Sequence, residues 1–128
     1  MNTNWYELLI KPVFTPPAWV FAPAWIFLYI LIGVSFVIFL KSGIKQSRKL
    51  PLIFFFAQLA LNLIWSPVFF GAKNIGLALI IVVLLWITLA FTIWEFNKHT
   101  VLAAYLLIPY FLWVTFAAYL NAGIYFLN

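Results

Sequence analysis

The stretch "NIGLALIIVVLLWITLAFTIW", residues 74–94, contains no charged side chain. A helix needs about 20 mostly apolar residues to cross the hydrocarbon core of a bilayer, and this stretch is long enough. Three other uncharged runs are longer still, at residues 12–40, 50–72 and 100–128. We therefore predict four transmembrane helices, at about residues 17–40, 51–70, 75–95 and 102–126.

The composition also indicates a membrane protein. Of the 128 residues, 68% are hydrophobic and 7% are charged, whereas soluble domains carry about 25% charged residues. A small soluble domain leaves much of its surface in water and could not hide so much apolar area. The expected fold class is an all-α, polytopic integral membrane bundle, with residues 1–128 as one domain and membrane lipid as its solvent.

Short charged segments separate the runs and predict an orientation. With four crossings, both termini lie on one side, together with Lys11 and Lys73. The other side holds five basic residues: Lys41, Lys45, Arg48, Lys49 and Lys98. Because cytoplasmic loops carry the excess of Lys and Arg, we expect the 41–49 loop in the cytoplasm and both termini outside, in a bacterial cell membrane.

The sequence offers little for metal binding or acid–base catalysis. Cysteine is absent, which excludes disulfides and thiolate ligands. Glu7 and Glu95 fall on opposite sides of the membrane, so they cannot form a carboxylate pair within one chain, and His99 is not expected to complete a catalytic triad. The net charge of +5 is spread over loops between apolar runs, which is typical of a membrane surface and not of nucleic-acid binding. We predict no metal, no required cofactor and no nucleic-acid partner.

Polar side chains within the second predicted helix lie on one face. Gln58, Asn62 and Ser66 are spaced i, i+4 and i+8, and Trp65 joins this stripe. Polar groups in lipid are costly and often functional. Their alternative role is to hold helices together, through hydrogen bonds that contribute about 0.6 kcal/mol on average in a membrane.

Aromatic residues on the other helices match this stripe. Trp25 and Tyr29 are spaced i and i+4 in the first helix. The fourth helix has a similar row: Tyr110, Trp113, Ala117 and Asn121.

Three tryptophans lie well inside their spans, where an indole N–H needs a partner. They are Trp25, Trp86 and Trp113, and we expect them to converge with the polar stripe around a pocket. Pro23 and Pro109 should kink their helices and open space between them.

Three blocks of the sequence resemble the translocator protein family, also called tryptophan-rich sensory proteins (TspO/MBR). They are "WYELLIKPVFTPPAWVFAPAW" at 5–25, "AQLALNLIWSPVFFGAKNIG" at 57–76 and "PYFLWVTFAAYLN" at 109–121. The resemblance implies a helical membrane protein, often a homodimer, that binds porphyrins and other lipophilic small molecules below a lid loop at about 5–17. The implied ligand-binding positions are Tyr6, Pro17, Trp25, Gln58, Asn62, Trp65, Trp113, Ala117 and Asn121.

Family members usually have a further helix before the first block, whereas this sequence begins four residues ahead of Trp5. We expect either a four-helix form or a longer protein with an upstream segment. The leading functional hypothesis is a membrane binding protein for a porphyrin such as protoporphyrin IX. One alternative is a light-dependent porphyrin-degrading enzyme, in which Trp25 and Trp113 would be the catalytic candidates. Another is a small transporter or regulatory subunit that acts through partner contact.

Overall fold

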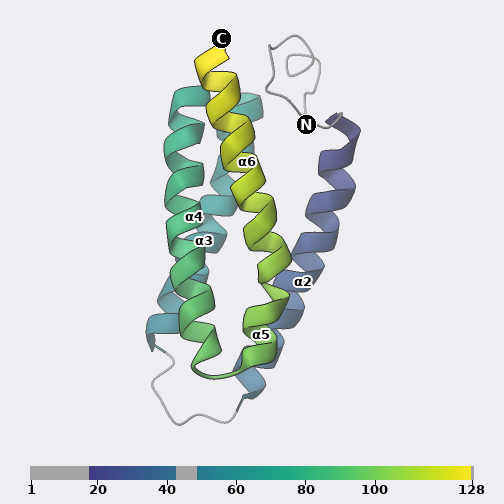
Figure 1. The fold of residues 1–128 in the computed structure, drawn as a ribbon, viewed down its shortest axis with the longest axis vertical. Helices are drawn as coiled ribbons and strands as arrows, with labels where there is room; N and C mark the ends of the chain where they lie inside the picture. The colour runs from purple at the N-terminus through teal and green to yellow at the C-terminus, as the bar shows by residue number, and fades with distance from the viewer. Residues whose placement is uncertain (1–17, 43–48, 128) are drawn as a thin grey trace.

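The structure is a computed structural model that describes residues 18–42 and 49–127 (Figure 1). In this part of the chain all regular structure is helical. The elements are η1 (Ala18–Val20), α2 (Phe21–Lys41), α3 (Lys49–Ser66), η2 (Pro67–Gly71), α4 (Ile75–Asn97), α5 (Val101–Leu106) and α6 (Ile108–Leu127). The predicted lid loop at about 5–17 lies outside the described residues.

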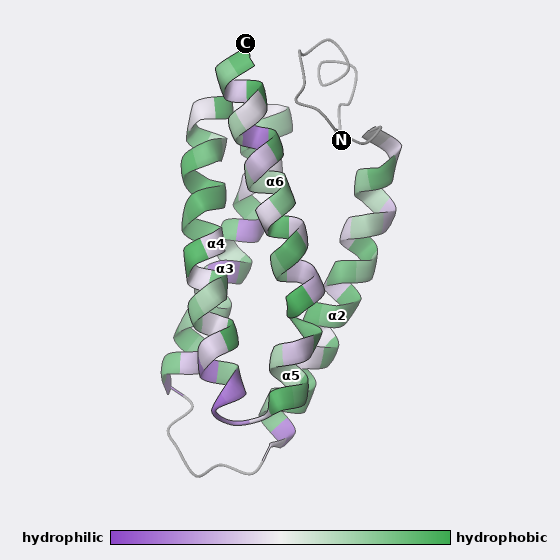
Figure 2. Cartoon of the chain, viewed as in Figure 1, coloured by the Kyte–Doolittle hydropathy of each residue, from purple (hydrophilic) through white to green (hydrophobic). Residues whose placement is uncertain are grey.

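Four segments are long and apolar enough to cross a membrane: Phe21–Lys41, Lys49–Gly71, Ile75–Asn97 and Val101–Leu127. Hydrophobic residues predominate along these helices (Figure 2). Large apolar side chains such as Ile26, Leu63 and Leu112 are more than half exposed, which is stable only in contact with lipid. The predicted fold class is therefore confirmed, and the chain is an integral membrane protein.

Local sequence explains the tight connection between η2 and α4. Lys73 has a φ of 56°, in the left-handed region, which lets the chain reverse direction. Asn74 then caps α4, because its side-chain oxygen accepts a hydrogen bond of 3.1 Å from the N–H of Leu77.

The prolines act in different ways. The last span is interrupted between α5 and α6, two residues before Pro109, as expected for a residue that cannot donate to the preceding turn. The kink expected at Pro23 is not found. Pro23 lies in the first turn of α2, where backbone N–H groups have no partner inside the helix, and α2 continues without a break to Lys41. Pro67 instead begins the wide π-helical turn η2, closed by a 2.9 Å bond from the N–H of Ala72 to its carbonyl.

The helices form an open arc around α4. α4 packs against α3 on one side and against α5 and α6 on the other, and α2 packs mainly on α5 (Figure 1). The buried stripe of α4 is Ala78, Ile81, Val82, Leu85, Leu89, Thr92 and Phe96. The backbones of α2 and α3 make few close contacts, so side chains must close this seam.

Phenylalanine rings close the seam at the end of the bundle where α2 ends and α3 begins. We call the four rings of Phe36, Phe55, Phe96 and Phe39 the phenylalanine stack. Phe36 stacks on Phe55 at 4.5 Å, Phe55 on Phe96 at 5.7 Å, and Phe96 on Phe39 at 4.2 Å between ring centroids. The stack joins α2, α3 and α4 with rings that lie 4–16° from parallel.

The phenylalanine stack predicts a position-dependent cost of truncation. Phe96→Ala should lower the free energy of unfolding by about 3 kcal/mol, because it leaves a cavity among rings that cannot easily collapse. Phe91→Ala on the same helix should cost less than about 1 kcal/mol, since that ring is 52% exposed and lipid can replace it. Thermal unfolding of the two purified variants and the wild type in the same detergent would test this. Equal unfolding midpoints for Phe96→Ala and Phe91→Ala would contradict this role of the stack.

Candidate functional site

A chain of hydrogen bonds crosses the middle of the bundle. The hydroxyl of Tyr29 donates to Oδ1 of Asn62 (2.5 Å), and Nδ2 of Asn62 donates to the hydroxyl oxygen of Tyr110 (2.7 Å). Tyr110 in turn donates to Oε1 of Gln58 (2.8 Å). We call these four residues the polar chain. It connects α2, α3 and α6 at a depth where water cannot replace any of its members.

The polar chain ends in an unused donor. Nε2 of Gln58 is fully buried and has no hydrogen-bond partner in the described part of the protein. A buried donor without a partner is rare in native proteins and costs about 1–3 kcal/mol. A ligand with an acceptor group could supply the missing partner.

A second pair of bonds holds Trp65 in place. Its Nε1 donates to Oδ1 of Asn121 (3.0 Å), and Nδ2 of Asn121 donates to the carbonyl oxygen of Ile75 (3.1 Å). Both ends of the Asn121 amide are therefore occupied by the protein. Asn121 positions the indole of Trp65, and its predicted contact with a ligand would use the remaining hydrogen-bonding capacity of its amide.

Aromatic rings surround Trp25 near the opposite end of the bundle from the phenylalanine stack. Ring centroids lie at 5.8 Å for Tyr29, 6.4 Å for Trp65, 6.5 Å for Tyr110 and 6.2 Å for Trp113. We call these five residues the aromatic cluster. Their tilted and edge-to-face arrangements are favourable contacts of about 0.5–1.5 kcal/mol each. The indole of Trp25 thus occupies the centre of the site.

A small cavity of about 90 Å³ opens beside Trp25, between α2 and α3. It is lined by Ala22, Trp25, Tyr29, Asn62, Trp65 and Ser66. Sites for drug-sized ligands measure about 300–1,000 Å³. The cavity is therefore too small for a drug-sized ligand in this structure, and the Trp25 ring forms part of its wall.

An apolar groove of about 450 Å³ lies on the other side of α2, toward α6. Its lining residues are Ala24, Phe27, Leu28, Pro109, Leu112, Trp113 and Phe116. Nε1 of Trp113 is buried and without a hydrogen-bond partner in the region that the structure covers. Residues of α2 line both this groove and the small cavity.

The structure places most of the expected ligand-binding residues in one region. Trp25, Asn62 and Trp65 line the small cavity, and Trp113 contacts Trp25 from the side of the groove. Gln58 lies deeper, behind Tyr110, and Ala117 is buried on the same helix as Asn121. Tyr6 and Pro17 fall outside the described residues.

Trp86 does not belong to this region. Its Nε1 donates to Oγ1 of Thr115 (2.8 Å), and its ring lies 5.2 Å from that of Phe111 between α4 and α6. The expectation that it converges with Trp25 was wrong because Trp86 follows Leu85 of the buried α4 stripe by one residue, which turns it about 100° around the helix.

Two tyrosines that were not among the expected ligand-binding residues are central. Tyr110 links Asn62 to Gln58 and is fully buried, and Tyr29 begins the polar chain. The sequence signal for both was their spacing from Trp25 and Trp113. Among the residues that the structure describes, no three His, Asp or Glu side chains gather as metal ligands.

The chain is similar to known proteins along most of its length. The model of the TspO/MBR family matches residues 1–127. A protein named tryptophan-rich protein TspO from Archaeoglobus fulgidus is 42% identical over 98% of this chain and 80% of its own length. The tryptophan-rich sensory protein of Cereibacter sphaeroides is 40% identical over 92% of this chain and 73% of its own length. The translocator protein of Homo sapiens is 39% identical, with 92% and 71% covered.

The polar chain predicts a measurable contribution of the Tyr110 hydroxyl. Tyr110→Phe should lower the free energy of unfolding by about 1–2 kcal/mol, because it leaves both Asn62 and Gln58 short of a partner. Tyr125→Phe removes a hydroxyl from an exposed ring of the same helix and should change it by less than about 0.5 kcal/mol. Chemical denaturation in mixed micelles would test this, and an unchanged Tyr110→Phe protein would mean that the polar chain adds no stability.

Proposed function

We propose that this chain, which belongs to the TspO/MBR family, is a membrane-embedded binding protein for tetrapyrroles such as protoporphyrin IX and for similar lipophilic molecules. In this proposal it has a sensory, regulatory or transport role. The observation that carries the proposal is the aromatic cluster around Trp25, next to a polar chain with one unused donor. The names of two relatives, tryptophan-rich sensory protein and translocator protein, are consistent with such a role.

The physics of the membrane limits what can drive this binding. A ligand that arrives from lipid gains little hydrophobic free energy, because lipid tails are already apolar. Affinity must then come from ring contacts of about 0.5–1.5 kcal/mol each and from hydrogen bonds in a medium of low dielectric constant. Trp25, Trp65 and Trp113 can supply the first, and Gln58 the second.

Binding of a porphyrin also requires the site to open. The cavity of about 90 Å³ is too small, and the Trp25 indole must leave the centre of the aromatic cluster. α2 is suited to this movement because the phenylalanine stack holds one of its ends, whereas its other end packs lightly on α6. Movement of that end would join the small cavity to the groove near Trp113, and the ligand would lie between α2, α3 and α6.

We also propose how the protein sits in its membrane. The excess of basic residues around 41–49 and at Lys98 favours a cytoplasmic position for that end and an outer position for both termini of a bacterial cell membrane protein. The open seam between α2 and α3 would suit a homodimer, in which a second copy covers exposed side chains such as Phe56 and Ile64.

Titration with protoporphyrin IX in the dark tests the proposal. Tryptophan fluorescence of the purified protein should be quenched with saturation, and the double variant Trp25→Phe, Trp113→Phe should bind about tenfold more weakly because it loses two indole contacts. The matched control is Trp86→Phe, Trp94→Phe, which removes the same number of indoles away from the small cavity and should keep wild-type affinity. Linear quenching that is equal in all three proteins would overturn the proposal.

The second candidate function is light-dependent degradation of the porphyrin. It is favoured by the contact of three indoles, in which the ring centroid of Trp25 lies 6.4 Å from that of Trp65 and 6.2 Å from that of Trp113. An excited porphyrin in that place would have oxidisable rings on several sides.

Illumination of the porphyrin complex in air distinguishes this candidate from binding alone. If Trp25 or Trp113 takes part, loss of Soret absorbance should need light and oxygen and should slow at least about tenfold in the Trp25→Phe and Trp113→Phe single variants at saturating porphyrin. Equal rates in wild type and variants would identify the protein as a carrier of a photosensitiser and not as an enzyme.

A further inference from the structure

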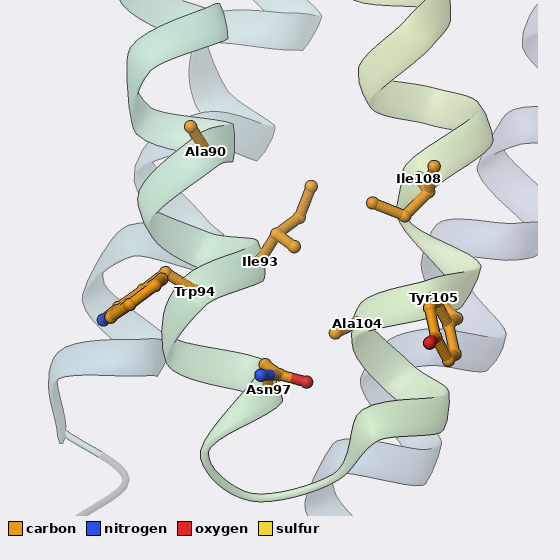
Figure 3. A pocket seen from close by; sticks show the side chains of 7 residues that line it. All are labelled: Ala90, Ile93, Trp94, Asn97, Ala104, Tyr105 and Ile108. Carbon is orange, nitrogen blue, oxygen red and sulfur yellow. The ribbon is translucent and has the colours of Figure 1, made fainter.

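A separate groove lies at the opposite end of the bundle from the aromatic cluster, between the last turns of α4 and the α5–α6 junction (Figure 3). Its volume is about 240 Å³. It is lined by Ala90, Ile93, Trp94, Asn97, Ala104, Tyr105 and Ile108. None of these residues belongs to the polar chain or to the aromatic cluster.

The groove has an apolar body with aromatic edges. Ile93 and Ile108 extend from facing helices, and the small side chains of Ala90 and Ala104 leave space beside them (Figure 3). The rings of Trp94 and Tyr105 are 66% and 67% exposed. Tryptophan and tyrosine near the end of a span are typical of the membrane–water interface.

One end of the groove is polar. Asn97 lies there, in the last turn of α4, on the side toward Ala104 (Figure 3). Asn97, Trp94 and Tyr105 are all exposed residues, so the Asn97 amide, the Trp94 indole N–H and the Tyr105 hydroxyl lie where a lipid head group could reach them.

The charge at this end is positive. Lys98 follows Asn97 directly and pairs with Glu95 at 3.2 Å, with 41% of its side chain exposed. Lys41 and Lys49 lie at the same end, where α2 stops and α3 starts. Within the part of the chain that the structure describes, three basic residues therefore lie at this end against the single acid Glu95. Basic sites between transmembrane helices at such an end favour anionic lipid head groups.

We propose that this groove binds one anionic phospholipid from the surrounding leaflet. One acyl chain lies along Ile93, Ile108 and the two alanines, and the phosphate is bound by the Asn97 amide and the Lys98 ammonium group. Trp94 and Tyr105 flank the glycerol region, where both can donate hydrogen bonds to ester oxygens.

The shape of the groove argues against other occupants. A volume of about 240 Å³ lies below the range of about 300–1,000 Å³ for compact drug-sized ligands, whereas part of one flexible acyl chain can occupy a smaller groove that is open to the bilayer. A transmembrane helix of a second copy needs close backbone approach over small residues. The protruding rings of Trp94 and Tyr105 at the edges prevent that approach.

Quenching of Trp94 by brominated phospholipids tests the inference on the full chain in vesicles. The Trp94 signal is the difference between wild type and Trp94→Phe. Phosphatidylglycerol brominated in its acyl chains should quench it at a mole fraction about fivefold lower than brominated phosphatidylcholine, the preference expected for one basic side chain near the head group. Lys98→Gln should remove this preference for two reasons. It removes the positive charge near the phosphate, and it leaves the negative charge of Glu95 without its partner.

A larger side chain in the groove distinguishes binding at this site from a general attraction of anionic lipid to the basic end of the protein. Ala90→Leu should weaken quenching by both lipids, whereas Ala60→Leu on the exposed face of α3 and Lys73→Gln at the other end should change neither. Equal quenching by the two lipids in wild type, or full quenching in Ala90→Leu, would overturn the proposal. If Ala90→Leu fails to fold, the exposed Lys98→Gln variant decides, because it must abolish the lipid preference.

Discussion

The polar chain from Tyr29 through Asn62 and Tyr110 to Gln58 is the interaction on which the arrangement of the helices depends. Lipid offers no partner for an amide or a hydroxyl, so these groups must find each other inside the bundle. Their side chains reach across the seam between α2 and α3, whose backbones make few close contacts. The polar chain therefore sets the distance between α2 and α3. The aromatic cluster lies in the space that this distance leaves.

On either side of the polar chain, α2 is held in two different ways. Toward Lys41, nearly parallel rings at 4.2–5.7 Å form a dense contact with α3 and α4. Toward Phe21, the contacts of Trp25 are tilted or edge-to-face at 5.8–6.5 Å, with a cavity and an apolar groove beside them. Close-packed regions resist movement, whereas loosely packed ones open at low cost. This asymmetry is the reason why the proposed opening of the site is assigned to the end of α2 near Phe21.

Hydropathy was sufficient to predict four helices, because uncharged runs of this length have one stable arrangement in lipid. Spacing was sufficient for the face of α3, where Gln58, Asn62 and Trp65 do meet. Spacing gave the wrong position for Trp86, because the sequence alone does not show how α4 is rotated about its axis. Trp86 lies one residue beyond the buried stripe of α4 and contacts Thr115 instead of Trp25. It also did not show that Asn121 is already bound to Trp65 and Ile75 or that Trp25 forms part of the wall of the small cavity, because both depend on side-chain rotamers chosen in packing.

Specificity in this chain must come from few atoms. Apolar contacts distinguish poorly between one lipophile and another, and exchange of lipid for ligand gains little from burial of apolar surface. A hydrogen bond in hydrocarbon is different, because a donor without its acceptor has no substitute partner. Gln58 offers such a donor between the helices, whereas Asn97 offers an exposed amide at the basic end. Under the two proposals, Gln58 would favour a ligand with an acceptor in the plane of its rings, and Asn97 would favour a lipid by its head group. Substitution of the surrounding phenylalanines or leucines would then change the affinity of each site, whereas substitution of either amide would change which ligand or lipid is preferred.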